Sequence, residues 1–332
     1  MGDRGVAAGV APAIGRADRE PLVSLSSVRL IIATVLGLAA SAALAAPASA
    51  GTAEPSAAVT PAPVSTGAPA PGPAGPAAVP PGDTRVAACG LTPTNGTAVR
   101  RIGGTGREYR VRVPAGLSGQ VPLLLALHGG GQEPTVHENA SGWNAFAAEK
   151  KFIVAYPRGS SLLNAPSWQL DRGSADVTYL RNVVDDIARQ WCVNPKRVHV
   201  AGFSNGGQMA GRMACDESDK FASAATHAGP ILTLECEMSR PIGFGVSSYE
   251  GDPLKQLMEG QRDAWLGNNK CDRTPHAETG PGVVVGQRFD CPANTRVYWR
   301  LYQGGGHYWP TGAQGADLRN RMWGLFVNHP LP

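Results

Sequence analysis

Two kinds of apolar pattern alternate along most of the chain. Residues 121–127 and 152–157 are short apolar runs without a charge, which is typical of strands covered on both faces. Residues 176–191 instead repeat apolar side chains at the spacing of one helical face. The further predicted strands are 108–113, 197–202, 241–248 and 295–303, and the further predicted helices are 144–151, 206–215 and 316–329.

Strands that alternate with helices predict an α/β fold, a mostly parallel sheet flanked by helices. In such a sheet, functional side chains gather in the loops beyond the carboxyl ends of the strands. Candidate catalytic residues are therefore expected where predicted strands end.

The first part of the chain has a different composition. Residues 30–46 are apolar and uncharged, Arg29 precedes them, and small residues follow as far as Ala50. This layout predicts a signal peptide over residues 1–50 that is cleaved near Ala50, with a single membrane anchor as the alternative. Residues 51–88, rich in Ala, Pro, Gly, Ser and Thr, predict a disordered linker. We expect a secreted protein, without stable membrane insertion, whose residues 89–332 form one domain.

Charge and cysteine content narrow the functional classes. The 332 residues carry a formal net charge of +4, and no basic run is interleaved with aromatic residues, so we expect no nucleic-acid partner. The six cysteines include no CxxC pair, and no histidine pair has zinc spacing, so we expect neither a metal nor another cofactor. An even number of cysteines in an exported chain predicts up to three disulfides. The expected pairs are Cys271–Cys291, Cys215–Cys236 and Cys89–Cys192.

A serine stands where a predicted strand becomes a predicted helix. Residues 202–206 read Gly-Phe-Ser-Asn-Gly, the G-x-S-x-G pattern that holds a nucleophile on a sharp turn. The free N–H groups at the start of the following helix favour nearby negative charge. We therefore expect Ser204 to be a nucleophile and Asn205 to donate its amide to an oxyanion.

A second glycine-rich turn follows the strand at residues 121–127. Residues 127–132, Leu-His-Gly-Gly-Gly-Gln, match the type of turn that lends a backbone N–H to an oxyanion hole. We expect this donor to come from residues 129–131, with Gly129 and Gly130 as the candidates.

A nucleophilic serine of this kind needs a base and an acid. His307 follows a predicted strand and precedes the last helix, the expected place for the base, and His276 is the alternative. The acid is expected after the strand at residues 241–248, where we choose Asp252 over Glu250. The order Ser204, Asp252, His307 is that of an α/β-hydrolase.

Two tryptophans lie close to these motifs in the sequence. Trp168 lies in the Pro-Ser-Trp-Gln stretch, and Trp309 follows His307 by two residues. We expect both to line an acyl or aryl pocket, with core packing as the alternative.

From Cys89 to its end, the chain resembles secreted esterases of the polyhydroxybutyrate-depolymerase and feruloyl-esterase type (LpqC-like). The motifs that carry the resemblance are YRVRVPAGL, LLLALHGGG, VNPKRVHVAGFSNGGQMA and GGGHYWP. The resemblance implies an α/β-hydrolase fold, with Ser204 as nucleophile, His307 as base and residues 128–130 as the oxyanion turn. It implies the acid less directly, because VSSYEGD lacks the His-Gly pair that the family usually shows there.

These observations predict a serine esterase that acts on hydroxyalkanoate oligomers or similar esters. A feruloyl or acetyl esterase of plant polysaccharide is the second hypothesis, and a non-catalytic exported binding protein is the third. The chain ends soon after residue 329, whereas family members that degrade solid polyester often carry a further binding module. The resemblance therefore implies soluble esters or oligomers rather than crystalline polyester.

Overall fold

The computed structural model describes residues 90–332, except residues 163 and 232–235. The signal peptide and linker predicted over residues 1–88, and Cys89 of the third predicted disulfide, lie outside the described residues. Within the described part of the chain, no helix is long and apolar enough to cross a membrane.

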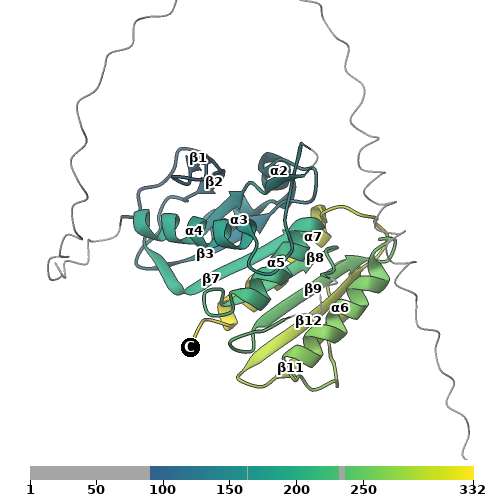
Figure 1. Cartoon of the computed structure of the whole chain (residues 1–332). Helices are drawn as coiled ribbons and strands as arrows, with labels where there is room; N and C mark the ends of the chain where they lie inside the picture. The colour runs from purple at the N-terminus through teal and green to yellow at the C-terminus, as the bar shows by residue number, and fades with distance from the viewer. Residues whose placement is uncertain (1–89, 163, 232–235) are drawn as a thin grey trace, which may run out of the picture. The chain divides into compact units, whose positions relative to one another are not determined.

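Ten strands form one sheet, in the order β1-β2-β4-β3-β7-β8-β9-β12-β11-β10 (Figure 1). The central strands from β4 to β12 are parallel, and the two strands at each edge pair antiparallel. The α/β fold class is thereby confirmed. The parallel strands are β3 (Val121–Leu127), β4 (Ile153–Pro157), β7 (Val193–Phe203), β8 (Ser223–His227), β9 (Gly243–Tyr249) and β12 (Thr295–Tyr302). The edge strands are β1 (Ala98–Arg101), β2 (Glu108–Arg112), β10 (His276–Ala277) and β11 (Val283–Cys291).

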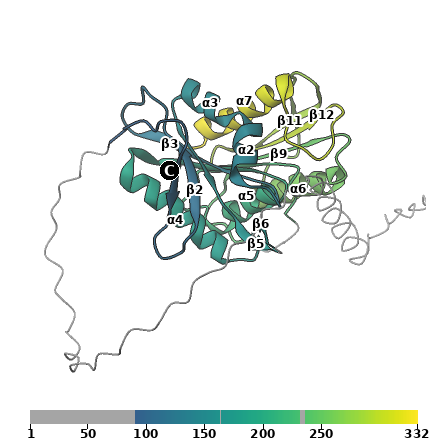
Figure 2. The same ribbon diagram turned by 90° about the horizontal axis from the view of Figure 1, so that it is seen from above.

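Helices cover both faces of the sheet (Figure 2). The side chains of α4 (Ala175–Gln190), α5 (Asn205–Asp216) and α6 (Lys255–Asn268) belong to one hydrophobic cluster. Those of α3 (Trp143–Lys150) and α7 (Gly312–Asn328) belong to a second cluster on the other face. The short α2 (Pro134–Ser141) follows the glycine turn after β3.

The strand β3 shows why the central strands are uninterrupted apolar runs. Leu123 and Leu125 pack in the first cluster, whereas Leu124 and Ala126 pack in the second. Because successive side chains of a strand point to opposite faces, helices on both faces require apolar residues at every position.

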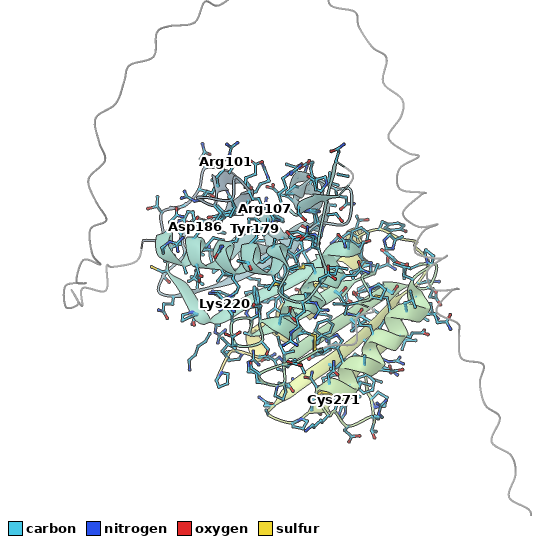
Figure 3. All side chains as sticks on the ribbon, in the orientation of Figure 1. Arg101, Arg107, Tyr179, Asp186, Lys220 and Cys271 are labelled. Atoms are coloured by element: carbon cyan, nitrogen blue, oxygen red, sulfur yellow. A yellow bond between two sulfur atoms is a disulfide. The ribbon has the colours of Figure 1, made fainter. Side chains whose placement is uncertain are left out.

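Two smaller features complete the domain. A separate hairpin consists of β5 (Ser160–Leu162) and β6 (Ala165–Ser167). The predicted disulfides Cys215–Cys236 and Cys271–Cys291 are confirmed. Cys271 lies at the end of the domain that carries α6 and β11 (Figure 3).

Candidate active site

Ser204 lies at the junction of β7 and α5, in a backbone conformation that residues other than glycine rarely adopt. Its φ is 50° and its ψ is −124°. The turn is so tight that a Cβ atom on Gly202 would lie 2.1 Å from the carbonyl oxygen of Gly206. A Cβ atom on Gly206 would lie 2.3 Å from the carbonyl oxygen of His128. The G-x-S-x-G spacing therefore has a steric cause: only glycine fits on either side of the serine turn.

Ser204, His307 and Asp252 form a continuous hydrogen-bonded chain. The Ser204 Oγ lies 2.8 Å from His307 Nε2. The two Asp252 carboxylate oxygens lie 3.1 and 3.3 Å from His307 Nδ1. The Asp252 side chain is fully buried, whereas that of His307 is 22% exposed. When Nδ1–H donates to the carboxylate, Nε2 is free to accept the proton of the Ser204 hydroxyl.

The structure distinguishes the two candidate acids. The Glu250 side chain is exposed, and its amide donates to the carbonyl oxygen of Tyr302 at 3.0 Å, which ties the end of β9 to the end of β12. This link brings Asp252, two residues later, beside the loop that carries His307. Asp252 also accepts a hydrogen bond from the Leu254 amide at 2.8 Å, which fixes its carboxylate. The structure thus brings Asp252, and not Glu250, to the histidine.

The alternative base occupies a different part of the sheet. His276 lies on the edge strand β10, where its Nε2 pairs with Asp290 at 3.0 Å. His199 is buried in β7 and stacks on Phe326, with ring centroids 4.9 Å apart. Neither histidine is hydrogen-bonded to Ser204.

The glycine turn provides fewer donors than the sequence suggests. The Gly129 amide already donates to Gln132 Oε1 at 3.1 Å, and the Gly131 amide donates to the Pro166 carbonyl at 2.7 Å. Among the described residues, the amides of Gly130 and Asn205 have no hydrogen-bond acceptor. The Gly129 expectation is therefore corrected, because a side chain of the same turn occupies its amide. Gly130 and Asn205 lie close together, since a Cβ atom on Gly130 would lie 3.5 Å from that of Asn205.

His128 fixes the shape of this turn as a neutral side chain. Its Nε2 accepts the Gly159 amide at 3.0 Å, so Nδ1 carries the hydrogen and donates to the Gly129 carbonyl at 2.9 Å. Burial lowers the pKa of His128 to about 4. The imidazole therefore serves as a neutral link between the glycine turn and the segment after β4.

His227, which the sequence analysis did not single out, connects the serine turn to the histidine loop. Its carbonyl accepts the Ser204 amide at 3.0 Å, and its Nε2–H donates to the Tyr308 carbonyl at 3.1 Å. Burial lowers the pKa of His227 to about 4, so the ring is neutral near pH 7. Its position at the end of β8, beside β7, is the sequence signal that could have identified it.

The two tryptophans lie in the interior, each with 4% of its surface exposed. The Trp168 Nε1–H donates to the carbonyl oxygen of His128 at 2.9 Å. The Trp309 ring packs edge-on against His137, with centroids 5.0 Å apart. This burial differs from the expected pocket-lining position, because both rings are used for internal contacts. The exposed aromatic ring beside His307 is instead that of Tyr308, which is 51% exposed.

The site therefore combines a hydroxyl that is hydrogen-bonded to an imidazole, a buried carboxylate, and two backbone amides that have no hydrogen-bond acceptor. This combination can activate the hydroxyl and hold a developing negative charge on a carbonyl oxygen. Within the described residues, no group of three or more His, Cys, Asp or Glu side chains is arranged to hold a metal ion.

Sequence comparisons show which known proteins the chain resembles. Residues 141–266 match the prolyl oligopeptidase family. The chain is 31% identical over 240 residues to the bifunctional acetylxylan esterase/xylanase XynS20E of Neocallimastix patriciarum, a match that covers 70% of this chain and 35% of that protein. It is 30% identical over 251 residues to "Putative esterase NocK" of Nocardia uniformis subsp. tsuyamanensis, which covers 64% of this chain and 73% of that protein.

A structural comparison shows the same fold. The acetyl xylan esterase from Aspergillus awamori has a TM-score of 0.52 at 15% identity, over 69% of this chain and 99% of that chain.

The chain spans between 30% and 44% of the length of several curated relatives that it matches. It belongs to the α/β-hydrolase esterases, in the family that includes feruloyl esterases and poly(3-hydroxyalkanoate) depolymerases.

Proposed function

We propose that this protein is a serine esterase that hydrolyses carboxylic esters through an acyl-enzyme on Ser204. The observation that carries the proposal is the hydrogen-bonded chain from Ser204 Oγ through His307 to the buried Asp252. The membership of an esterase family supports it.

In the first step, the Ser204 oxygen attacks the ester carbonyl while His307 Nε2 takes the hydroxyl proton. Asp252 stabilises the imidazolium that forms. The carbonyl oxygen becomes an oxyanion, which the amides of Gly130 and Asn205 hold. Collapse of this intermediate breaks the ester bond, and the alcohol leaves with the proton from His307.

In the second step, water replaces the alcohol. His307 takes a proton from the water as its oxygen attacks the acyl-enzyme. The same two amides hold the second oxyanion. When the intermediate collapses, Ser204 regains its proton from His307 and the carboxylic acid is released.

Esters with a small or aromatic acyl group are the proposed substrates. Hydroxyalkanoate oligomers are supported by the poly(3-hydroxyalkanoate) depolymerase C of Paucimonas lemoignei, whose match extends over 124 residues. Feruloyl or acetyl esters of polysaccharide are supported by longer matches to relatives named for those activities, over 240 and 246 residues. The matched lengths favour the second class, and the exposed Tyr308 ring beside His307 offers an aromatic acyl group a surface to contact.

Two measurements test the proposal. Ser204→Ala should lower hydrolysis of p-nitrophenyl butyrate by at least about a thousandfold, since losses of a triad member reach about 10⁴–10⁶. Unchanged hydrolysis would remove Ser204 from the mechanism, and a wild-type protein that hydrolyses no ester would support the non-catalytic binding protein. A panel of methyl ferulate, acetylated xylan and a 3-hydroxybutyrate trimer then separates the substrate classes by kcat/KM.

We also propose that the protein is exported. Disulfides form and persist mainly in oxidising compartments outside the cytosol, and two of them lie within the described residues. The amino-terminal sequence of the protein from culture medium should begin near Gly51. A protein recovered only inside cells, with residues 1–50 intact, would contradict export.

A further inference from the structure

The segment that ends the β5–β6 hairpin contacts the glycine turn. The Pro166 carbonyl accepts the Gly131 amide at 2.7 Å. Two residues later, the Trp168 indole N–H donates to the His128 carbonyl at 2.9 Å. Gly130, one of the two amides without an acceptor, lies between these two attachment points in the sequence.

The same segment also contacts Asn205, which carries the other amide without an acceptor. The Trp168 amide donates to Asn205 Oδ1 at 2.7 Å, and the Ser167 hydroxyl donates to the same oxygen at 3.0 Å. Asn205 Nδ2 donates to Gln208 Oε1 at 3.2 Å. The Asn205 side chain is thus held from two sides, and the start of α5 is held with it.

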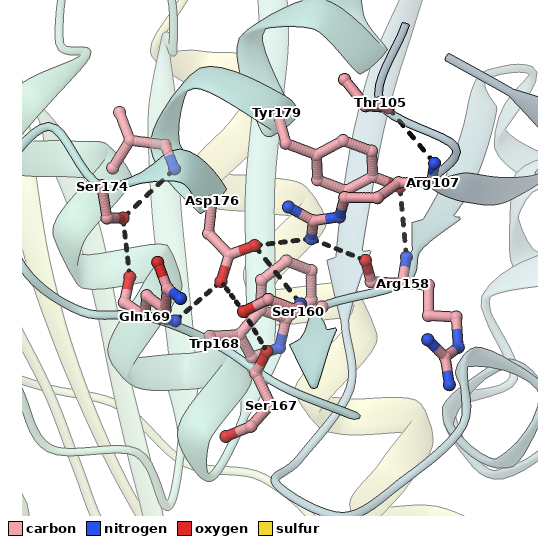
Figure 4. A network of polar contacts seen from close by, with 12 residues as sticks. Thr105, Arg107, Arg158, Ser160, Ser167, Trp168, Gln169, Ser174, Asp176 and Tyr179 are labelled. Atoms are coloured by element: carbon pink, nitrogen blue, oxygen red, sulfur yellow. Dashed lines mark hydrogen bonds and ion pairs between the residues drawn. The ribbon is translucent and has the colours of Figure 1, made fainter. Parts of the chain in front are cut away.

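A buried carboxylate holds the hairpin segment in turn (Figure 4). Asp176, near the start of α4, is fully buried. Its Oδ2 accepts the Gln169 amide at 2.7 Å and the Ser160 hydroxyl at 2.8 Å. These two bonds fix one residue of β5 and the residue that follows Trp168.

An arginine balances the Asp176 charge. The Arg107 Nη2 lies 2.5 Å from Asp176 Oδ1 and donates to the Arg158 carbonyl at 2.8 Å. The Arg107 guanidinium carbon lies 3.6 Å from the centre of the Tyr179 ring. Because a buried carboxylate without partners would be strongly unfavourable, this set of donors compensates for the burial of Asp176 and holds its side chain in place.

We propose that residues 166–168, anchored by Asp176, position the oxyanion hole, with Trp168 as the main positioning residue. The inference rests on the proposed esterase function. It gives Trp168 a role different from substrate contact: the residue joins the two separate chain segments whose amides must converge on one oxygen atom. The hydrogen bonds of Trp168 act through His128 and Asn205.

Such a role has a kinetic signature. Donors of an oxyanion hole act on the charge that develops in the transition state, within about 2.7–3.1 Å of the oxyanion. A small displacement of the two amides should therefore lower kcat while KM changes little. A residue that only fills the core would change stability without this selective effect.

The test compares Trp168→Phe with a matched control, Trp191→Phe. Both indoles are buried, and each donates to a backbone carbonyl, that of Thr92 in the case of Trp191, at 3.1 Å. Each variant keeps an aromatic ring and loses one indole N–H. With p-nitrophenyl butyrate, Trp168→Phe should lower kcat at least about tenfold and leave KM within about twofold of the wild-type value. This loss of kcat is smaller than the roughly 10²–10³-fold loss that follows when an oxyanion-hole donor is removed outright, because the two amides are displaced and not lost. Trp191→Phe should keep kcat within about twofold.

Butaneboronic acid supplies a second measurement. Its tetrahedral adduct with Ser204 places an oxygen in the oxyanion hole. The product butyrate forms no such adduct, so its binding serves as the comparison. Trp168→Phe should raise the inhibition constant of the boronic acid by about the same factor as it lowers kcat, and that of butyrate by less than about twofold.

Three outcomes would overturn the inference. They are an unchanged kcat in folded Trp168→Phe, an equal loss of kcat in Trp191→Phe, and equal weakening of boronic acid and butyrate binding. If Trp168→Phe does not fold, Ser167→Ala decides: a loss of kcat of at least about threefold at constant KM supports the inference, and an unchanged kcat refutes it. Failure of the esterase proposal would look different, because the wild-type protein itself would then hydrolyse no ester.

Discussion

Replacing Asp252 with asparagine tests how far the buried carboxylate governs ester hydrolysis. Asparagine keeps the size of the side chain, but its amide can donate a hydrogen bond to His307 Nδ1, which favours the tautomer with its hydrogen on Nε2. That tautomer cannot accept the proton of Ser204. The Asp252 side chain is fully buried, so water cannot take over the role of the carboxylate.

The expected magnitude follows from this geometry. The corresponding change in a serine protease lowers kcat by about 10⁴-fold, which corresponds to about 5.4 kcal/mol at about 1.36 kcal/mol per tenfold. We expect Asp252→Asn to lower kcat/KM for p-nitrophenyl butyrate by about 10³–10⁴-fold.

The neighbouring carboxylate provides the control. Glu250→Gln removes an exposed charge two residues away and should leave kcat/KM within about twofold of the wild-type value. The reasoning would be refuted if Asp252→Asn kept more than about a tenth of the wild-type activity, or if Glu250→Gln lost as much.

Three further predictions concern stability. Gly202→Ala should lower the unfolding free energy by at least about 2 kcal/mol in urea titrations, because the added Cβ would lie 2.1 Å from a carbonyl oxygen. The control Gly260→Ala, at a position of α6 with no atom close to the added Cβ, should be neutral or stabilising by up to about 1 kcal/mol. Equal effects of the two variants would contradict the steric explanation. Removing the Cys215–Cys236 disulfide, whose sequence separation is 21 residues, by the double Cys→Ala variant should destabilise the protein by about 3 kcal/mol, and an unchanged urea midpoint would contradict this estimate of chain entropy. Burial lowers the pKa of His128 and His227 to about 4, so between about pH 4 and 6.5 the unfolded chain binds more protons than the folded one. The unfolding free energy should therefore fall by about 2 kcal/mol per histidine from pH 7 to pH 5, and a melting temperature that stays constant or rises at pH 5 would show that these histidines are not kept neutral by folding.

Much of the fold follows from local patterns. The parallel core can be predicted from the sequence because its strands are covered on both faces, so that Leu123 to Leu127 are apolar without a break. The hairpin β5–β6 cannot be predicted in this way, because each strand has only three residues. The long edge strand β11 mixes polar and apolar residues, and its position is set by pairing with β12 rather than by a pattern of its own.

The candidate site also has residues that local sequence patterns predict and residues that only tertiary contacts determine. Ser204 and His307 can be predicted because the elbow needs glycines and the histidine loop has a fixed place in the order of the fold. The choice between Asp252 and Glu250 depends on how two loops pair, which only the structure shows. The Gly129 amide donates a hydrogen bond to the side chain of Gln132, and a contact of this kind cannot be predicted from the sequence.

The identity of the acylated residue tests the central claim most directly. Wild-type protein mixed rapidly with p-nitrophenyl butyrate, quenched with acid and analysed by peptide mass spectrometry should carry one butyryl group on Ser204, and an early burst of p-nitrophenol should accompany it. A burst with the butyryl group on another residue, or hydrolysis that continues in Ser204→Ala at the wild-type rate, would contradict the account.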